Sequence, residues 1–203
     1  MTPSRIIRVV PTLLLSVSAA ALLVGEGWLT VRRSADWRDD AALARSSLAS
    51  SPGNAYALCS LGSMAAQRGD LDDADVLLAD ALDRNREAWR TWDAICFLRL
   101  HQGRLDEAER ACREGLTKNP GNPRGWVNLA SVYVQSARWR DASFAAERAV
   151  ALKSRYGEAR YLAAASAANL GRMDQARAHL ARGIEADPDN PRLRDLERLF
   201  LAR

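Results

Sequence analysis

Hydrophobic and polar residues alternate with helical periodicity over most of this chain. Large apolar side chains recur three residues apart, as in Trp92-x-x-Ile95 and Trp126-x-x-Leu129. This spacing places them on one face of an α-helix and leaves the other faces polar. Short polar runs with glycine, proline or asparagine separate the apolar segments, and such runs end helices. The pattern therefore predicts an all-α chain of short amphipathic helices.

Four columns of residues recur at one constant interval, about 34 residues, without an insertion. A fixed period of this length is the signature of a helical solenoid, in which each unit stacks on its neighbours. Each unit is expected to contain two helices, and its small residues allow the two backbones to approach closely. The columns are Gly69, Gly103, Ala137 and Gly171; Ala74, Ala108, Ala142 and Ala176; Ala81, Gly115, Ala149 and Gly183; and Leu82, Leu116, Val150 and Ile184.

Particular residues mark where the helices of each unit begin and end. The Gly69 column is expected to end each first helix in the left-handed conformation, which costs other residues roughly 1–2 kcal/mol. Ala137 departs from this column and predicts a strained or differently shaped third turn. Between units, asparagine follows Pro-Gly or Pro-Asp and is expected to cap the next helix. These asparagines are Asn54, Asn122 and Asn190.

The third unit, residues 123–156, carries the most complete set of these residues, namely Trp126, Leu129, Ala130, Tyr133, Ala142 and Ala149. The set resembles the signature of the tetratricopeptide repeat, W-x2-L-G-x2-Y followed by spaced alanines. The resemblance covers residues 55–190, as four repeats, and implies a right-handed α-α superhelix. Arg99 and Arg160 depart from it, because the family has an aromatic and a large apolar residue at those positions.

Both flanks extend the repeat pattern. Trp37 lies three periods before Trp139 and has matching charged neighbours, so residues 36–50 are predicted to form a lone second helix. Residues 191–203 are predicted to form the polar-backed capping helix that a solenoid needs for solubility. Its apolar stripe consists of Leu193, Leu196, Leu199 and Phe200.

An apolar segment precedes the repeats. After a tail at residues 1–8, residues 9–31 contain a single charged residue, Glu26, and Arg32 and Arg33 then end the apolar run. As a helix this segment would span about 34 Å, enough to cross the hydrocarbon core of a bilayer. The segment therefore predicts a single N-terminal transmembrane anchor.

A cleaved signal peptide is the alternative for this segment, with Ala19-Ala20-Ala21 as its small-residue cleavage site. Apolar sequence continues past that point through Val24, which favours an uncleaved anchor. A short tail before a single span favours a cytoplasmic N-terminus. The repeats are therefore expected outside the cytoplasm.

Composition narrows the range of functions. The net charge of +4 is small, and basic residues are interspersed with acidic ones, so the chain offers no nucleic-acid surface. Cys59, Cys96 and Cys112 are odd in number and form no CxxC pair. They are therefore expected to be small buried hydrophobic residues, neither a disulfide framework nor a zinc site.

The sequence holds no catalytic pattern. His101 and His179 are the only histidines, and neither has a metal-ligating or catalytic partner three or four residues further on. The adjacent acids Asp72 and Asp73 diverge around a helix axis and cannot share a substrate. The prediction is a protein with no enzymatic activity, cofactor, metal site or small-molecule substrate.

The resemblance also implies where a partner would bind. In the tetratricopeptide repeat family the first helices line a concave groove, and here that groove would mix apolar and basic side chains, which suits a peptide or helix with apolar anchors and an acid or two. The Lys and Asn set with which some members clamp a chaperone carboxylate is absent, because Cys59, Ser63 and Phe97 occupy those places. The candidate partner-binding residues are Tyr56, Arg90, Asp93, Phe97, His101, Arg124, Val127, Gln135, Tyr161 and Asn169.

Anchor and groove together predict a membrane scaffold or adaptor that binds a partner protein or peptide, within a bacterial envelope assembly. Two alternatives stay open. The junction from Trp28 to Asn54 resembles the passage from the last span to the repeats in multi-spanning O-mannosyltransferases, which implies an accessory module of a membrane glycosyltransferase system. The other alternative is a self-assembling structural solenoid, although the arginine-rich cap at residues 192–203 argues against open stacking.

Overall fold

The computed structural model describes residues 40–201 and divides the chain into two units, Met1–Pro52 and Gly53–Arg203. In the first unit it describes one helix, α2 (Asp40–Ser50), which lies within the lone second helix predicted at 36–50. The predicted tail at 1–8 and the predicted anchor at 9–31 lie outside the described residues. Among residues 40–201, no helix combines the length and the apolar character needed to cross a bilayer.

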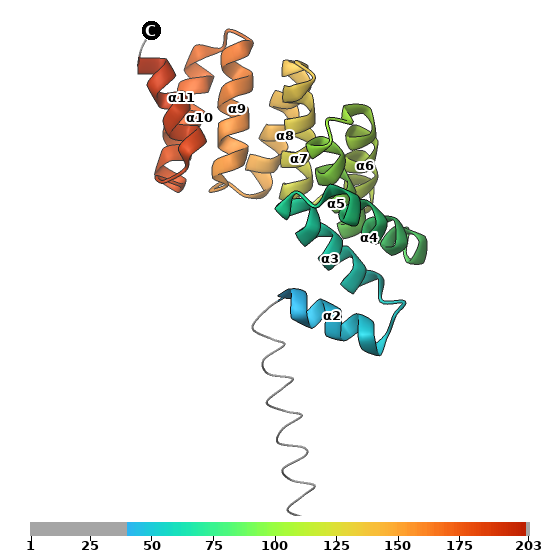
Figure 1. Ribbon diagram of the computed structural model, residues 1–203. Helices are drawn as coiled ribbons and strands as arrows, with labels where there is room; N and C mark the ends of the chain where they lie inside the picture. The colour runs from blue at the N-terminus through green and yellow to red at the C-terminus, as the bar shows by residue number, and fades with distance from the viewer. Residues whose placement is uncertain (1–39, 202–203) are drawn as a thin grey trace, which may run out of the picture. The chain divides into compact units, whose positions relative to one another are not determined.

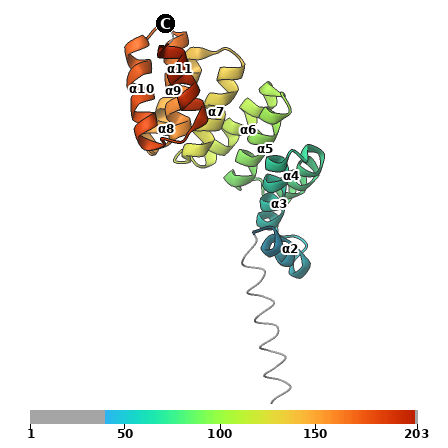
Figure 2. The same cartoon turned by 60° about the vertical axis from the view of Figure 1, so that its left-hand side comes forward.

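The second unit consists of helix pairs that follow one another along the chain (Figure 1), and in two views each second helix runs beside its first helix (Figure 2). First helices and second helices each begin at the constant interval that the repeat pattern predicts. This arrangement confirms the all-α solenoid. The helices are α3 (Ala55–Arg68), α4 (Leu71–Arg84), α5 (Trp89–His101), α6 (Leu105–Lys118), α7 (Pro123–Gln135), α8 (Trp139–Leu152), α9 (Gly157–Asn169), α10 (Met173–Ala186) and α11 (Pro191–Leu201).

Small side chains form the centre of each helix pair. The alanine that recurs once per repeat on the second helices is completely buried in all four pairs. This alanine column consists of Ala74, Ala108, Ala142 and Ala176. A second column of small residues, seven positions further on, holds Gly115 in the second repeat, where an added Cβ atom would lie only 3.3 Å from the Cβ of Trp92. The close approach of the two backbones therefore depends on small residues in both columns.

The helix ends follow the sequence expectations. Asn54, Asn122 and Asn190 each accept a hydrogen bond through Oδ1 from the backbone N–H two residues further on, which confirms them as caps of α3, α7 and α11. Between first and second helices, the residue in the turn has a positive φ of 54–90° in all four pairs. Ala137 adopts this conformation with a φ of 54°. The third turn therefore has the same shape as the others, and its alanine carries the strain.

The fourth residue of the first helix makes the same hydrogen bond in the second, third and fourth repeats, and the fourth residue of the capping helix makes it too. Its side-chain N–H donates to the backbone carbonyl six residues earlier, whether the side chain is an indole or a guanidinium. Arg160 therefore keeps the contact that a tryptophan makes at its position, and Arg194 continues the series in the capping helix. The bonds join Trp92 Nε1 to Arg86 O (2.8 Å), Trp126 Nε1 to Pro120 O (2.9 Å), Arg160 Nε to Ser154 O (3.2 Å) and Arg194 Nε to Pro188 O (2.9 Å).

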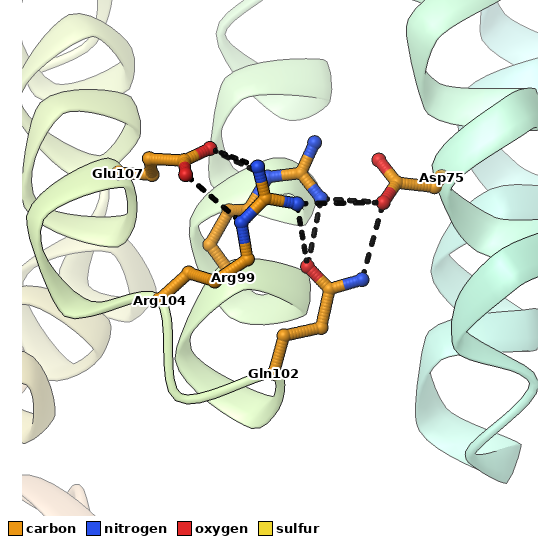
Figure 3. Close-up of polar contacts among 5 residues, drawn as sticks. All are labelled: Asp75, Arg99, Gln102, Arg104 and Glu107. Carbon is orange, nitrogen blue, oxygen red and sulfur yellow. Dashed lines mark hydrogen bonds and ion pairs between the residues drawn. The ribbon is translucent and has the colours of Figure 1, made fainter.

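Arg99 stands in a polar joint between the first and second helix pairs (Figure 3). Its Nη1 donates to Asp75 of α4 at 2.6 Å, and its Nε lies 3.4 Å from Glu107 of α6. One repeat later, Tyr133 occupies the same position, and its hydroxyl donates at 3.0 Å to Glu109, the equivalent of Asp75. The arginine thus takes over the hydrogen bond of the expected aromatic residue.

The cysteine prediction was wrong in one respect. All three cysteines are buried, as expected, but Cys96 of α5 and Cys112 of α6 form a disulfide. Cys59 is the remaining free thiol. The spacing rules used for disulfide frameworks apply to small loop-rich domains, whereas here the helix pair brings two distant positions together.

We predict that Ala137→Gly raises the free energy of unfolding by about 0.5–1 kcal/mol, because glycine removes the left-handed strain and loses part of the gain through a freer unfolded chain. Gly103→Ala, at a turn where a Cβ meets no atom within 4 Å, should lower it by about 1 kcal/mol. Urea unfolding of both variants measures the two effects. Equal effects of the same sign would contradict the strain assignment.

We predict that Asp75→Asn lowers the free energy of unfolding at pH 7 by roughly 1–2 kcal/mol, because it weakens a charge-assisted bond to Arg99. That bond is the main cause that holds the pKa of Asp75 below its usual 3.8. The wild-type advantage is therefore complete above pH 4 and is lost as the pH falls through the lowered pKa.

Urea titrations from pH 2.5 to pH 7 measure this difference. Asp80→Asn on the same helix is the control, since Asp80 forms an exposed pair with Arg84 and should change stability by less than about 0.5 kcal/mol. A pH-independent effect at Asp75 would be evidence against an ionic joint.

Candidate partner-binding groove

A cleft of about 630 Å³ runs across the first helices of the second unit. Its walls come from α5, α7 and α9, with α11 adding one residue, and each of these helices packs against the next. The capping helix thus contributes Arg192 to the cleft. First helices line the cleft, as the sequence analysis expected. We refer to it below as the groove.

The apolar part of the groove comes from three successive first helices. Phe97 of α5, Val127 and Val134 of α7, and Tyr161 of α9 line it together. Val127 is buried, whereas the two rings and Val134 are half-buried and keep area available for contact. Ligand sites for apolar groups commonly combine buried side chains with partly exposed aromatic rings in this way.

A polar cluster joins α5 and α7 at the groove. Asn128 of α7, which is buried, donates through Nδ2 to Asp93 of α5 at 3.0 Å, and Arg124 Nε lies 3.7 Å from the same carboxylate. Burial raises the pKa of the Asp93 carboxyl, against the opposing effects of Arg124 and Asn128. Arg124 lines the groove, its side chain is half exposed, and its guanidinium lies 5.8 Å from the centre of the Phe97 ring.

A second arginine stands at the capping end of the groove. Arg192 of α11 pairs with Glu158 of α9, and its guanidinium lies 5.5 Å from the centre of the Tyr161 ring. Arg124 and Arg192 thus share one arrangement, a cation held over a groove aromatic and tied to one acid. Together they place positive charge on either side of the apolar rings.

Six of the ten predicted binding residues line the groove, and four do not. Tyr56 lies on α3 with 67% of its surface exposed, and Arg90 packs over Trp89 of its own helix. Asp93 is not part of the groove lining and accepts a hydrogen bond from Asn128, which does line it. Asn169 belongs to a smaller hollow beside α10 and α11. The six that line the groove are Phe97, His101, Arg124, Val127, Gln135 and Tyr161.

The list of candidate binding residues lacks five polar or aromatic residues that line the groove, namely Asn128, Ser131, Tyr156, Glu158 and Arg192. Arg192 could have been found from periodicity, because it lies 34 residues after Glu158 and so continues the column of Arg124. Tyr156 precedes α9 in a connecting segment, where the repeat gives no directional signal. Asn128 lies one residue after Val127, at a position that the tetratricopeptide repeat family does not normally use to line its groove, but here it lines the cleft as well.

A separate apolar hollow of about 430 Å³ lies between α6, α7 and α8. Phe144 of α8, which is 63% exposed, and Trp126 line it with their rings 6.2 Å apart, edge to face. It shares no lining residue with the groove, so Phe144 is a useful comparison for experiments on the groove.

The two histidines lie apart and differ in setting. His101 lies in the groove with its ring 4.2 Å from that of Phe97. His179 of α10 connects the third and fourth repeats. Its Nε2 lies 2.7 Å from Glu147 of α8, and its Nδ1 lies 3.2 Å from Nη1 of Arg160 in α9. Because a guanidinium only donates, Nδ1 accepts and Nε2 carries the proton. Within residues 40–201, no group of three potential metal ligands is present.

Comparison with known proteins supports the tetratricopeptide repeat family. Residues 99–153 and 144–199 match the model of the tetratricopeptide repeat. A search among curated proteins returned no match. Many solved structures share the fold.

Three of these structures illustrate the similarity. A thermophilic TPR protein of Thermus thermophilus is 22% identical with a TM-score of 0.68, covering 86% of this chain and 96% of its own. YrrB, described as a TPR protein with an unusual peptide-binding site, is 21% identical with a TM-score of 0.62, covering 71% and 75%. The first TPR of Spaghetti, bound to an HSP90 peptide, is 25% identical with a TM-score of 0.54, covering 57% and 94%.

We predict that Asp93→Asn raises the free energy of unfolding at pH 7 by up to about 1 kcal/mol, because asparagine accepts the bond from Asn128 without burying a charge. Since the raised pKa favours the protonated carboxyl in the folded state, wild-type stability is penalised as the pH rises through that pKa. The gain should therefore vanish below pH 3.8. Urea titration against pH measures it, and a pH-independent loss of stability would show that the charged form is required.

Proposed function

We propose that this tetratricopeptide-repeat chain is a membrane-anchored scaffold or adaptor that binds a partner protein or peptide in its groove. The observation that carries the proposal is a cleft lined by first helices, with apolar rings between two arginines. The solved relatives named above include one described by its peptide-binding site and one bound to a peptide. They support peptide binding as a property of this fold.

The chemistry of the groove favours a partner segment with an apolar side chain and acidic neighbours. An apolar side chain would contact Phe97, Val134 and Tyr161 and displace water from their exposed faces. Carboxylates on either side would meet Arg124 and Arg192, whose present acids hold them only in part. A basic segment would meet like charge at both ends of the rings, which is unfavourable.

Residues 9–31 are proposed as the membrane anchor, with the repeats outside the cytoplasm as part of a bacterial envelope assembly. The support is a largely apolar sequence with a single charged residue, Glu26, and with arginines on both sides. An anchor would keep the groove near the membrane, where it could recruit its partner. Sodium carbonate extraction of the full chain tests the anchor: retention in the membrane fraction supports it, and release into the supernatant would overturn it.

The binding proposal is tested with full-length chain in its native cells by proximity labelling, followed by affinity measurement with peptides from the labelled partner. We expect Arg124→Glu and Tyr161→Ala each to weaken binding by at least about tenfold, as truncation of interface arginine and tyrosine commonly does. Both variants should lose some stability, because Arg124 lies beside the Asp93 carboxylate and the Tyr161 ring packs against the core. Circular dichroism therefore confirms that each variant is folded at the temperature at which affinity is measured.

Phe144→Ala is the matched control, since it removes a more exposed aromatic ring from the other hollow. Unchanged affinity in both groove variants, or equal loss in the control, would refute the groove as the binding site. Recovery of a multi-spanning glycosyltransferase would support the accessory-module alternative. Recovery of only further copies of this chain would support self-assembly.

A further inference from the structure

The disulfide between Cys96 and Cys112 joins the two helices of the second repeat, and the two Cα atoms lie 5.0 Å apart. Cys96 lies on the first helix, α5, and Cys112 lies sixteen residues later on the second helix, α6. Both are buried, with exposed fractions of 0% and 2%. The bridge is therefore part of the core and is closed to solvent in the folded chain.

The equivalent positions in the other repeats show what the bridge replaces. One period away in each direction, the same two positions hold small or apolar residues in contact across the helix pair. In the first repeat a Cβ atom on Gly62 would lie 2.7 Å from Cγ of Leu78, so those two helices touch at this point. The equivalent pairs are Gly62 with Leu78, Ala130 with Ala146, and Ala164 with Leu180.

This comparison separates the second repeat from the rest. Three repeats fill the position with noncovalent packing of apolar groups, and one fills it with two sulfur atoms. The lining of the groove begins next to the bridge, since Phe97 directly follows Cys96. The bridge thus fixes the helix pair that supplies one wall of the groove.

We infer that the second repeat is completed by oxidative folding, so that the chain is a substrate of a disulfide-donating oxidoreductase and matures in an oxidising compartment. The reaction is thiol–disulfide exchange. The thiolate of one cysteine attacks the donor's disulfide, and the second cysteine then displaces the donor from the mixed disulfide. The chain loses two protons and two electrons, and the donor leaves as a dithiol.

Burial of both sulfur atoms places this exchange before the helix pair closes, because a folded donor cannot reach them afterwards. Disulfides persist in extracytoplasmic compartments and are rare in the cytosol, where thiols are kept reduced. This inference rests on the bridge alone and is independent of the partner in the groove. A disulfide in the mature chain would also agree with the expected location of the repeats outside the cytoplasm.

The first test counts free thiols in the full chain as it exists in its native cells. Cells are quenched in acid and the denatured protein is alkylated with N-ethylmaleimide before intact-mass analysis. We expect one alkylated cysteine, Cys59, and three after reduction. Three alkylated cysteines before reduction, or peptide mapping that places Cys59 in a bridge, would overturn the inference.

The second test asks whether a donor is required and whether the bridge stabilises the fold. In cells that lack their disulfide-donating oxidoreductase, the chain should carry three free thiols; an unchanged single thiol would refute the donor. Reductant should lower the Tm of the wild type by roughly 6–12 °C, the value expected for closing a loop of about fifteen residues. The double variant Cys96→Ala, Cys112→Ala, which recreates the third repeat's alanine pair, should lose this sensitivity.

Cys59→Ala is the matched control, because Cys59 is a buried cysteine outside the bridge. It should keep the full response to reductant. A wild type whose Tm does not change with reductant would show that the bridge contributes nothing to the fold. These outcomes are read without any partner, so failure of the groove proposal leaves them unaffected.

Discussion

The architecture depends on the close approach of two antiparallel helices within each repeat. In each of the four repeats, the second helix carries a completely buried alanine at the same position, and a larger side chain there would push the two helices apart. Because each pair then has the same thickness, successive pairs stack at a constant interval. The first helices are held side by side as a consequence, and a cleft across them becomes possible.

Within that frame, polar residues replace aromatic ones by preserving a single hydrogen bond. Arg160 donates to the same carbonyl position as Trp126, and Arg99 reaches the acid that Tyr133 reaches one repeat later. The backbone acceptor or the acid is fixed by the repeat, so any side chain with an N–H or O–H at the right distance satisfies it. The stack tolerates such changes because each joint involves only neighbouring repeats.

The electrostatic character of the groove arises from one column of residues. Arg124, Glu158 and Arg192 follow one another at the repeat interval and alternate in sign along the first helices. Each arginine lies over an aromatic ring and is paired with one acid, and a single acid cannot occupy all five N–H donors of a guanidinium. The existing ion pairs hold both guanidinium groups in place before a partner arrives. A carboxylate of the partner therefore binds arginines that are already ordered, which lowers the conformational entropy lost on binding.

The repeat period was enough to predict the helices, their pairing, their caps and the left-handed turns, because it fixes local contacts that every repeat shares. The resemblance to the tetratricopeptide repeat family predicted most of the aromatic and basic groove residues from their positions on the first helices. The bond between Asn128 and Asp93 and the bridge between Cys96 and Cys112 became known only from the tertiary structure. Burial depth and cross-helix distance depend on how neighbouring helices pack, and no pattern within one helix specifies them.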